Sequence, residues 1–232
     1  MREFQYEKNS LEKQPWDHYM SLYSRADPAD ISARTGFMYD PERKEFPGIL
    51  FLGRSYAVNW PGFGIRLTEE RSVEEQRYDP LSEDMHARIL LLRILMRGTA
   101  CRGTGQFRTY RELPGGEVYL RQFDGRCTRR LASLYGDRIQ VFRSIMRDMG
   151  GRPVQAADAA FGLEVIPGYT VRLLLWEGDE EFPPSARFLF SDNFPLAFAA
   201  EDVAQLGDVI INTLKKTETG YGLSDSILQG IC

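Results

Sequence analysis

Three consecutive acids, Asp179, Glu180 and Glu181, form a compact group of side chains that could perform chemistry. Clustered carboxylates raise one another's pKa, so such a group can supply a general acid and a general base, or hold Mg²⁺. Asp158 and Asp192 are further carboxylates that could complete the site. The same acids could instead cap backbone amides or pair with arginines. The sequence leaves a catalytic role and a structural role open.

A second group of candidate residues is basic. Residues 88–152 contain fourteen arginines, no lysine and five acids, so this segment carries a net charge of +9 while the rest of the chain carries −13. Arginine presents a rigid, bidentate fork to carboxylate or phosphate, which makes Arg126, Arg129 and Arg130 candidate anion-binding residues. The opposite charge of the remaining chain favours a simpler interpretation, in which the basic segment is neutralised within the fold.

Several common catalytic and metal-binding patterns are missing from the sequence. Cys101, Cys127 and Cys232 are far apart and no CxxC pair occurs, so we expect neither a zinc site nor an iron–sulfur cluster. With only two histidines, no Ser-His-Asp or Cys-His arrangement can be recognised. The GTG at residues 103–105 matches neither common nucleotide-binding loop and favours plain turns. We predict no metal and no cofactor.

Charge and hydropathy limit the classes of partner. The net charge of −4 and the pI of about 5.4 argue against a general nucleic-acid binder. Apolar runs such as residues 89–92 are far too short to cross a bilayer, and the N-terminal residues contain no apolar signal core. We therefore expect a soluble, cytoplasmic protein with a small-molecule or protein partner of unknown identity, and neither nucleic acid nor membrane as a partner.

The elements that must position these residues predict an α+β fold. Alternating apolar patterns predict an N-terminal antiparallel meander within residues 37–67 and a C-terminal three-stranded meander, with a central helical layer packed against them. The C-terminal strands are expected at 161–165, 169–176 and 186–190, and a further strand at 107–113. Helices are expected from Pro15, over 27–34, from Ser82, over 120–134, over 139–149 and over 200–216. We expect a single domain over 15–216, a loose segment at 1–14 and a polar tail at 217–232.

Two apolar residues have specific expected positions. Cys127 lies on the apolar stripe of the helix at 120–134, so it is expected to be buried and not to act as a nucleophile. Phe182 lies between the acidic group and the pair Pro183 and Pro184, and we expect its ring to anchor the loop in the core. Loss of a buried phenyl ring usually costs about 3–5 kcal/mol.

The sequence also resembles a prokaryotic domain family of unknown function. The resemblance rests on the run LWEGDEEFPPSARFLF at 175–190, on AEDVAQLG at 200–207, and on matching pieces at Gly150-Gly151, ADAAF around Asp158 and RTYRELPGGEVY at 108–119. It extends from about Trp16 to Lys216. Family members occur mainly in anaerobes, and some carry an added cysteine-rich module like the four-iron cluster domain of corrinoid iron–sulfur proteins. This chain lacks those cysteines.

The resemblance implies a non-catalytic binding or accessory module in an anaerobic redox or corrinoid-linked system. Two alternatives come from the residues themselves. One is a carboxylate-based hydrolase or lyase that uses the loop from Asp179 to Glu181, and the other is a regulatory anion-binding protein that uses the arginine-rich helices. Whether the protein is an enzyme stays open at this level.

Overall fold

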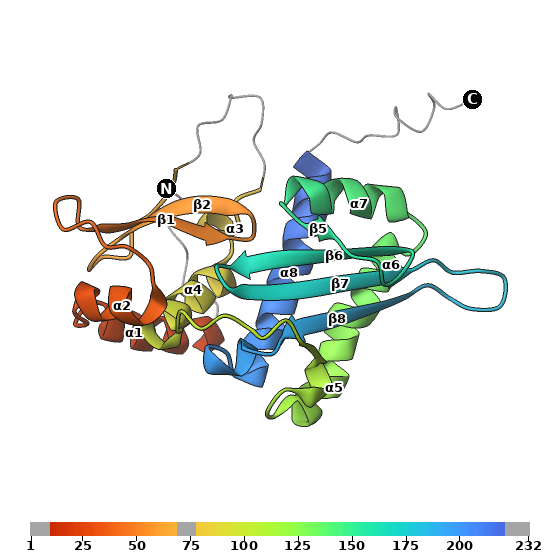
Figure 1. Cartoon of the computed structure of the whole chain (residues 1–232), viewed down its shortest axis with the longest axis horizontal. Coiled ribbons are helices and arrows are strands. Elements are labelled where there is room, and N and C mark those ends of the chain that lie inside the picture. The colour runs from red at the N-terminus through yellow and green to blue at the C-terminus, as the bar shows by residue number, and fades with distance from the viewer. Residues whose placement is uncertain (1–9, 69–77, 221–232) are drawn as a thin grey trace.

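The computed structural model describes residues 10–68 and 78–220 and shows the predicted α+β fold with two antiparallel sheets (Figure 1). The smaller sheet is the expected N-terminal meander, in the order β1-β2-β3. Its strands are β1 (Glu45–Phe51), β2 (Arg54–Asn59) and β3 (Ile65–Leu67). The helices that accompany it are α1 (Ser10–Tyr23), α2 (Pro28–Thr35), α3 (Pro80–Glu83) and α4 (Met85–Arg97).

The larger sheet has five strands in the order β4-β8-β7-β6-β5, and all neighbouring strands are antiparallel. Its strands are β4 (Phe107–Thr109), β5 (Arg152–Pro153), β6 (Ala159–Ile166), β7 (Tyr169–Trp176) and β8 (Ser185–Ser191). The three predicted strands form its centre. β4 is shorter than expected, and β5 is an edge strand that the sequence did not indicate. The two sheets meet where the Leu52 N–H donates to the Val165 carbonyl at 3.0 Å.

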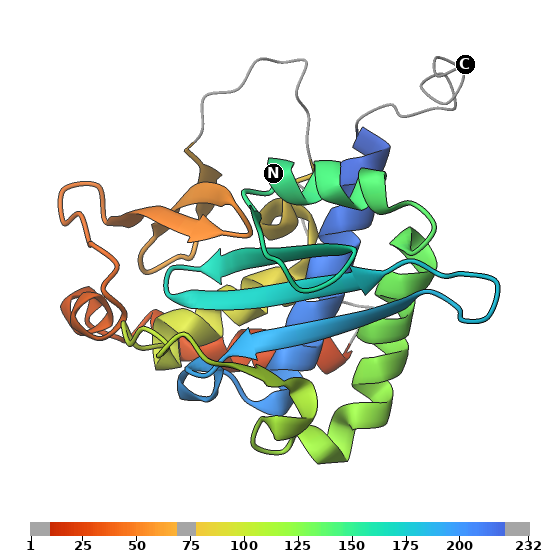
Figure 2. The same cartoon turned by 45° about the vertical axis from the view of Figure 1, so that its right-hand side comes forward.

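The two faces of the larger sheet differ, as β7 illustrates. Val171, Leu173 and Leu175 point to one face and are buried, while Thr170 and Arg172 point to the other and are partly exposed. Fully burying a side chain such as leucine contributes about 1.5–3 kcal/mol, so the apolar face must be covered. Helices cover that face (Figure 2). The opposite face is open around Thr170 and Arg172, whereas Leu174 further along β7 is buried on it.

The covering layer is a chain of helices between β4 and β5, closed by a long C-terminal helix. It comprises η2 (Tyr110–Glu112), α5 (Gly116–Phe123), the π-helical turn η3 (Asp124–Thr128), α6 (Arg129–Tyr135), α7 (Ile139–Asp148), η4 (Phe194–Leu196) and α8 (Ala200–Gly220). Cys127 is buried here, as predicted, and the layer is tight around it. A Cβ at Gly207 of α8 would lie 2.6 Å from the Cys127 Sγ.

Local capping explains where several elements begin. Asp27 accepts the Ala29 N–H and Pro28 follows it, so α2 begins where the sequence predicted. The main helix α4 begins later than expected, because Asp84 caps it and Ser82 belongs to the short α3. α1 begins at Ser10 instead of Pro15, and α8 continues to Gly220, past the predicted end. Residues 221–232 of the predicted tail lie outside the described residues.

The expected anchoring of the β7–β8 loop by Phe182 is wrong. Its side chain is 66% exposed. Pro184 makes the close contact instead, because a Cβ at Gly136, the residue after α6, would lie 2.1 Å from the Pro184 Cβ. The sequence could not reveal this contact because Gly136 and Pro184 meet only in the folded chain.

Candidate functional site

The acidic loop protrudes beyond the end of the larger sheet, between β7 and β8 (Figure 1). Asp179 is used to shape the loop, because its Oδ1 accepts the N–H groups of Glu181 at 2.9 Å and Phe182 at 2.7 Å. Glu180 and Glu181 are exposed, and no ion pair joins them to a basic side chain of the described residues. The loop therefore presents two solvated carboxylates and one that holds the backbone.

The larger sheet separates the other two candidate carboxylates. Asp158 lies at the loop end, where its Oδ2 accepts the Glu177 N–H at 3.0 Å. Asp192 follows β8 at the opposite end, about 20 Å away at roughly 3.3 Å per strand residue. The paired carboxylates of glycoside hydrolases lie about 5–10 Å apart. Asp192 thus does not join the loop acids, and within the described residues no three His, Cys, Asp or Glu side chains could together hold a metal ion.

Two of the three candidate arginines on the helices are occupied by acids and amides of α8. Arg126 forms an ion pair with Asp208, and Arg130 lies 3.8 Å from the same carboxylate while donating to the Asn212 Oδ1 at 2.8 Å. Arg129 is exposed, and no ion pair joins it to a carboxylate of the described residues. Much of the positive charge of this layer is thus matched by α8.

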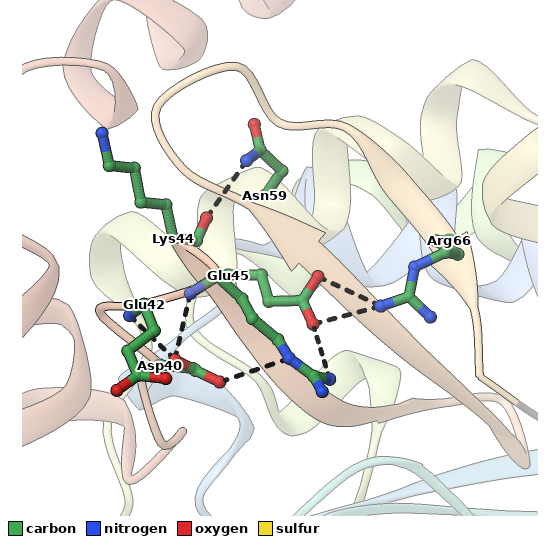
Figure 3. A network of polar contacts seen from close by, with 7 residues as sticks. Asp40, Glu42, Lys44, Glu45, Asn59 and Arg66 are labelled. Atoms are coloured by element: carbon green, nitrogen blue, oxygen red, sulfur yellow. Dashed lines mark hydrogen bonds and ion pairs between the residues drawn. The ribbon is translucent and has the colours of Figure 1, made fainter.

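Charges on the smaller sheet are also paired with one another (Figure 3). Both carboxylate oxygens of Glu45 accept from Arg66 at 3.1 Å, and Arg43 lies 3.9 Å from Glu45 and 3.8 Å from Asp40. The two arginine side chains are 59% and 72% exposed, so each pair contributes only about 0–1 kcal/mol. Two acids and two arginines thus balance one another beside the turn before β1.

The open face of the larger sheet carries a groove. Two adjoining cavities of about 530 Å³ and 290 Å³ share Phe107, Arg152, Glu164 and Thr170 in their walls, and together we term them the sheet-face groove. The larger cavity lies beside the glycine-rich loop at 102–106, and the smaller one lies over β5, β6 and β7. These volumes are in the range of small-molecule sites.

The lining of the sheet-face groove contains three arginines and one acid. Arg102 comes from the glycine-rich loop, Arg152 from β5 and Arg172 from β7, while Glu164 comes from β6. No ion pair joins any of these arginines to a carboxylate within residues 10–68 and 78–220. Glu164 is itself occupied, because its Oε1 accepts the Gly168 N–H at 2.8 Å. The groove is therefore a hollow with excess positive charge, which attracts anions.

An aromatic ring holds one of these arginines in place. The guanidinium carbon of Arg172 lies 3.7 Å from the centre of the Phe107 ring. Stacking of this kind uses the flat face of the guanidinium and leaves its N–H edges free to donate in the plane. Arg172 is thus pre-positioned, with its donors available to a ligand.

Gly162 leaves a gap in the row of side chains between two of the arginines. Arg152 pairs with Gly162 across β5 and β6, and Gly162 pairs with Arg172 across β6 and β7. A Cβ at Gly162 would meet no atom closer than 3.6 Å, so neither crowding nor backbone conformation requires glycine. Glycine inside a strand weakens it and often marks a bulge, a tight bend, or close approach of a ligand or of another backbone. We refer to this gap as the Gly162 notch.

Asp192 lies beside the sheet-face groove and holds the glycine-rich loop that lines it. It accepts the Thr104 N–H at 2.9 Å and also the Thr104 hydroxyl, and this hydroxyl bond lowers the pKa of the Asp192 carboxyl. A Cβ at Gly103 would lie 2.7 Å from the Asp192 Oδ1, so a side chain there would force the Asp192 carboxylate to shift. Asn193 adds bonds to the Cys101 and Gly168 carbonyls, both at 2.9 Å. This candidate acid therefore supports the groove and does not line up with the acidic loop.

A further cavity of about 370 Å³ lies between α7 and the segment before β6, and it includes Asp158 in its wall. It contains Arg143 and Arg147. Arg143 already donates to the Asp158 backbone carbonyl. With one of its two arginines occupied in this way, this cavity is a weaker anion site than the sheet-face groove.

Of the two cysteines in the described residues, Cys127 is buried and Cys101 is exposed. Burial raises the pKa of the Cys127 thiol to about 12, so almost no thiolate forms at neutral pH. Cys101 is exposed beside the glycine-rich loop, and its Sγ lies 3.6 Å from the Arg102 carbonyl. Neither thiol has a histidine beside it among the hydrogen bonds of the described residues.

Sequence reasoning missed the sheet-face groove because its arginines are far apart along the chain. The one available signal was the alternation in β6, where Gly162 and Glu164 fall between the buried Phe161, Leu163 and Val165. That alternation indicates an open face, but it cannot show that Arg152 and Arg102 lie beside it. The two-residue strand β5 is too short to leave a pattern.

Comparison with known proteins gives a family and no function. A family model described as a domain of unknown function, DUF3786, matches residues 27–213. No curated protein and no solved structure matched the chain. None of the helices in the described residues is both long and apolar enough to cross a membrane. With most of its length matched by this one model, the chain belongs to the DUF3786 family.

Proposed function

We propose that this domain is a non-catalytic binding module whose ligand is a small anion held in the sheet-face groove. The observation that carries the proposal is the contrast between two sets of arginines. Arg102 and Arg172 lie in a hollow without ion pairs to the described carboxylates, whereas Arg126 and Arg130 are held by Asp208. A groove with unpaired guanidinium groups is suited to bind carboxylates or phosphates.

The geometry favours this function over a hydrolase or lyase built on the acidic loop. Asp179 is engaged with the loop backbone, and Asp192 lies at the other end of the sheet. We assign anion binding to the open sheet face and not to the helices, because the helical candidates Arg126 and Arg130 already have partners. Arg129 alone of the original candidates stays available, and it lies outside the cavities.

We further propose that the module serves as an accessory in an anaerobic, redox or corrinoid-linked system of the cytoplasm. The support is the sequence resemblance, together with three widely spaced cysteines that suit a reducing compartment. Equilibrium dialysis against a corrinoid, read by its visible absorption, tests the link directly. Retention of about one corrinoid per chain would support it, and no retention at millimolar corrinoid would count against a direct corrinoid role.

Calorimetric titration of the purified protein with small carboxylates and phosphates at low salt tests the anion site. A hydrogen bond to a charged group is worth about 1.5–3 kcal/mol, so Arg152→Gln and Arg172→Gln should each weaken the binding of any bound anion about tenfold or more. Arg129→Gln is the matched control, since it removes the same charge outside the groove. Equal losses in all three variants, or no binding by the wild type, would overturn the proposal.

A further inference from the structure

We propose that the preferred ligand is an organic phosphate monoester, whose phosphoryl group lies in the Gly162 notch between Arg152 and Arg172. This inference rests on the proposed anion site and adds the chemical class of its ligand. The residues involved come from three adjacent strands, β5, β6 and β7, so the sheet itself fixes their spacing.

Two arginine side chains flank the notch, and the backbone of β6 forms its base. Arg152 and Arg172 flank Gly162 on neighbouring strands, so their backbones lie about 10 Å apart at roughly 4.8 Å per strand. Both side chains point to the open face, and the absent side chain at Gly162 leaves the strand backbone as the floor. A compact anion can enter there and face a guanidinium fork on each side.

The shape of a phosphoryl group suits two opposed forks better than a carboxylate does. A phosphate monoester has three peripheral oxygens arranged tetrahedrally, so two forks can each take oxygens from different sides. A carboxylate has two oxygens in one plane, and a single fork satisfies both. The monoester is also largely a dianion at pH 7, which balances the two arginine charges.

The remainder of the ligand has a place in the larger cavity of the groove. From the notch, the shared wall of Phe107 and Thr170 leads to the glycine-rich loop, where Arg102, Gly103 and Gly105 line the space of about 530 Å³. An organic group esterified to the phosphate would therefore lie along Phe107, which also holds Arg172 flat. Phe107 acts as a positioning residue for Arg172.

Titration with three phenyl compounds tests the ligand class. Phenyl phosphate, phenyl sulfate and phenylacetate share a ring but present a dianionic phosphate, a monoanionic tetrahedral ester and a planar carboxylate. We expect phenyl phosphate to bind at least tenfold more tightly than the other two at pH 7. If all three bind equally and Arg152→Gln weakens each of them, the anion site stands and the phosphate assignment fails. If none binds, both fail.

The pH dependence separates charge from shape. The charged residues that line the groove are Arg102, Arg152, Glu164 and Arg172, and the arginines stay protonated throughout. The second ionisation of a phosphate monoester lies near pH 6, so affinity for phenyl phosphate should fall about tenfold from pH 7 to pH 5. Affinity for phenyl sulfate should stay level, because a sulfate monoester keeps its single negative charge over this pH range. If the affinities for phenyl phosphate and phenyl sulfate change with pH in the same way, the ligand does not need to be a dianion and this part of the proposal fails.

A series of substitutions at Gly162 tests the location. Its Cβ has space, and valine favours strands, so Gly162→Ala and Gly162→Val should melt at the wild-type temperature or above it. The added methyl groups fill the notch, so we expect affinity for phenyl phosphate to fall about threefold with alanine and at least tenfold with valine. A folded Gly162→Val protein that binds as tightly as the wild type would overturn the proposal, and the alanine variant decides if valine prevents folding.

Discussion

Asp179 and Asp192 show how two similar side chains take different roles. Both accept backbone N–H bonds, Asp179 within the protruding loop and Asp192 beside the sheet-face groove. The Thr104 hydroxyl also donates to Asp192 and lowers the pKa of that carboxyl. The protonation state of Asp192 is therefore linked to the position of the glycine-rich loop beside the groove.

We expect Asp192→Asn to lower stability at pH 7, because the charged hydrogen bonds to Thr104 are weakened. The folded-state pKa lies below the usual value of about 3.9, so the stabilisation is complete above that pH and is lost as pH falls towards the folded-state pKa. The difference in the free energy of unfolding between wild type and variant, measured by urea unfolding, should therefore shrink from pH 7 to pH 3. The exposed Asp137→Asn is the control, and a gap that is the same at both pH values would contradict this role.

Phe182 and Phe188 give a second test at the residue scale. Phe182 is 66% exposed and Phe188 is 2% exposed on the face covered by helices. Phe182→Ala should therefore change the free energy of unfolding by about 0.5 kcal/mol or less, as exposed substitutions usually do. Phe188→Ala should cost about 3–5 kcal/mol. Urea unfolding of both variants decides, and a loss above about 2 kcal/mol for Phe182→Ala would show that the loop packs more closely than described.

Helix α8 is the element that connects the layers through charge. Asp202 near its start pairs with Arg93 of α4, and Asp208 and Glu218 pair with Arg126 and Arg138 of the helical layer. The first pair is the most buried, since the two side chains are 17% and 4% exposed. Burial also lowers the pKa of Arg93. A buried pair of this kind fixes how α4 and α8 pack.

Removing one charge of the Arg93–Asp202 pair should destabilise the fold more than removing both charges. Arg93→Met leaves Asp202 buried without its partner and should cost about 3–5 kcal/mol. The double variant Arg93→Met/Asp202→Asn should recover much of that loss, because no charge is left buried and Asn can still accept the Ala199 N–H. Chemical denaturation of the single and double variants provides the measurement. A double variant less stable than Arg93→Met would contradict this account.

At the scale of the whole molecule, pairing within the fold limits binding to polyanions. The ion pairs between α8 and the helical arginines imply that heparin binds weakly and is released near 0.15 M salt, where charges are screened beyond about 8 Å. Asp208→Asn should strengthen heparin retention, since it frees Arg126. Elution of both proteins from a heparin column at the same salt would show that this pairing does not limit the surface charge.

Much of the fold followed from the sequence, because apolar periodicity reports which faces are buried. β6 alternates from Phe161 to Val165 and β7 from Tyr169 to Leu173, and the stripe that holds Cys127 identified a buried helix face. The position of Phe182 and the groove were not predictable in this way. Both depend on contacts between distant residues, such as Pro184 against Gly136 and Arg172 over Phe107.

A crystal structure of the protein with phenyl phosphate would show directly whether the phosphoryl group binds in the Gly162 notch. We predict the phosphoryl group in the Gly162 notch, with donors of Arg152 and Arg172 about 2.7–2.9 Å from its oxygens. The phenyl ring should lie along Phe107. A phosphoryl group beside Arg143 and Arg147, or an empty sheet-face groove at saturating ligand, would contradict the account.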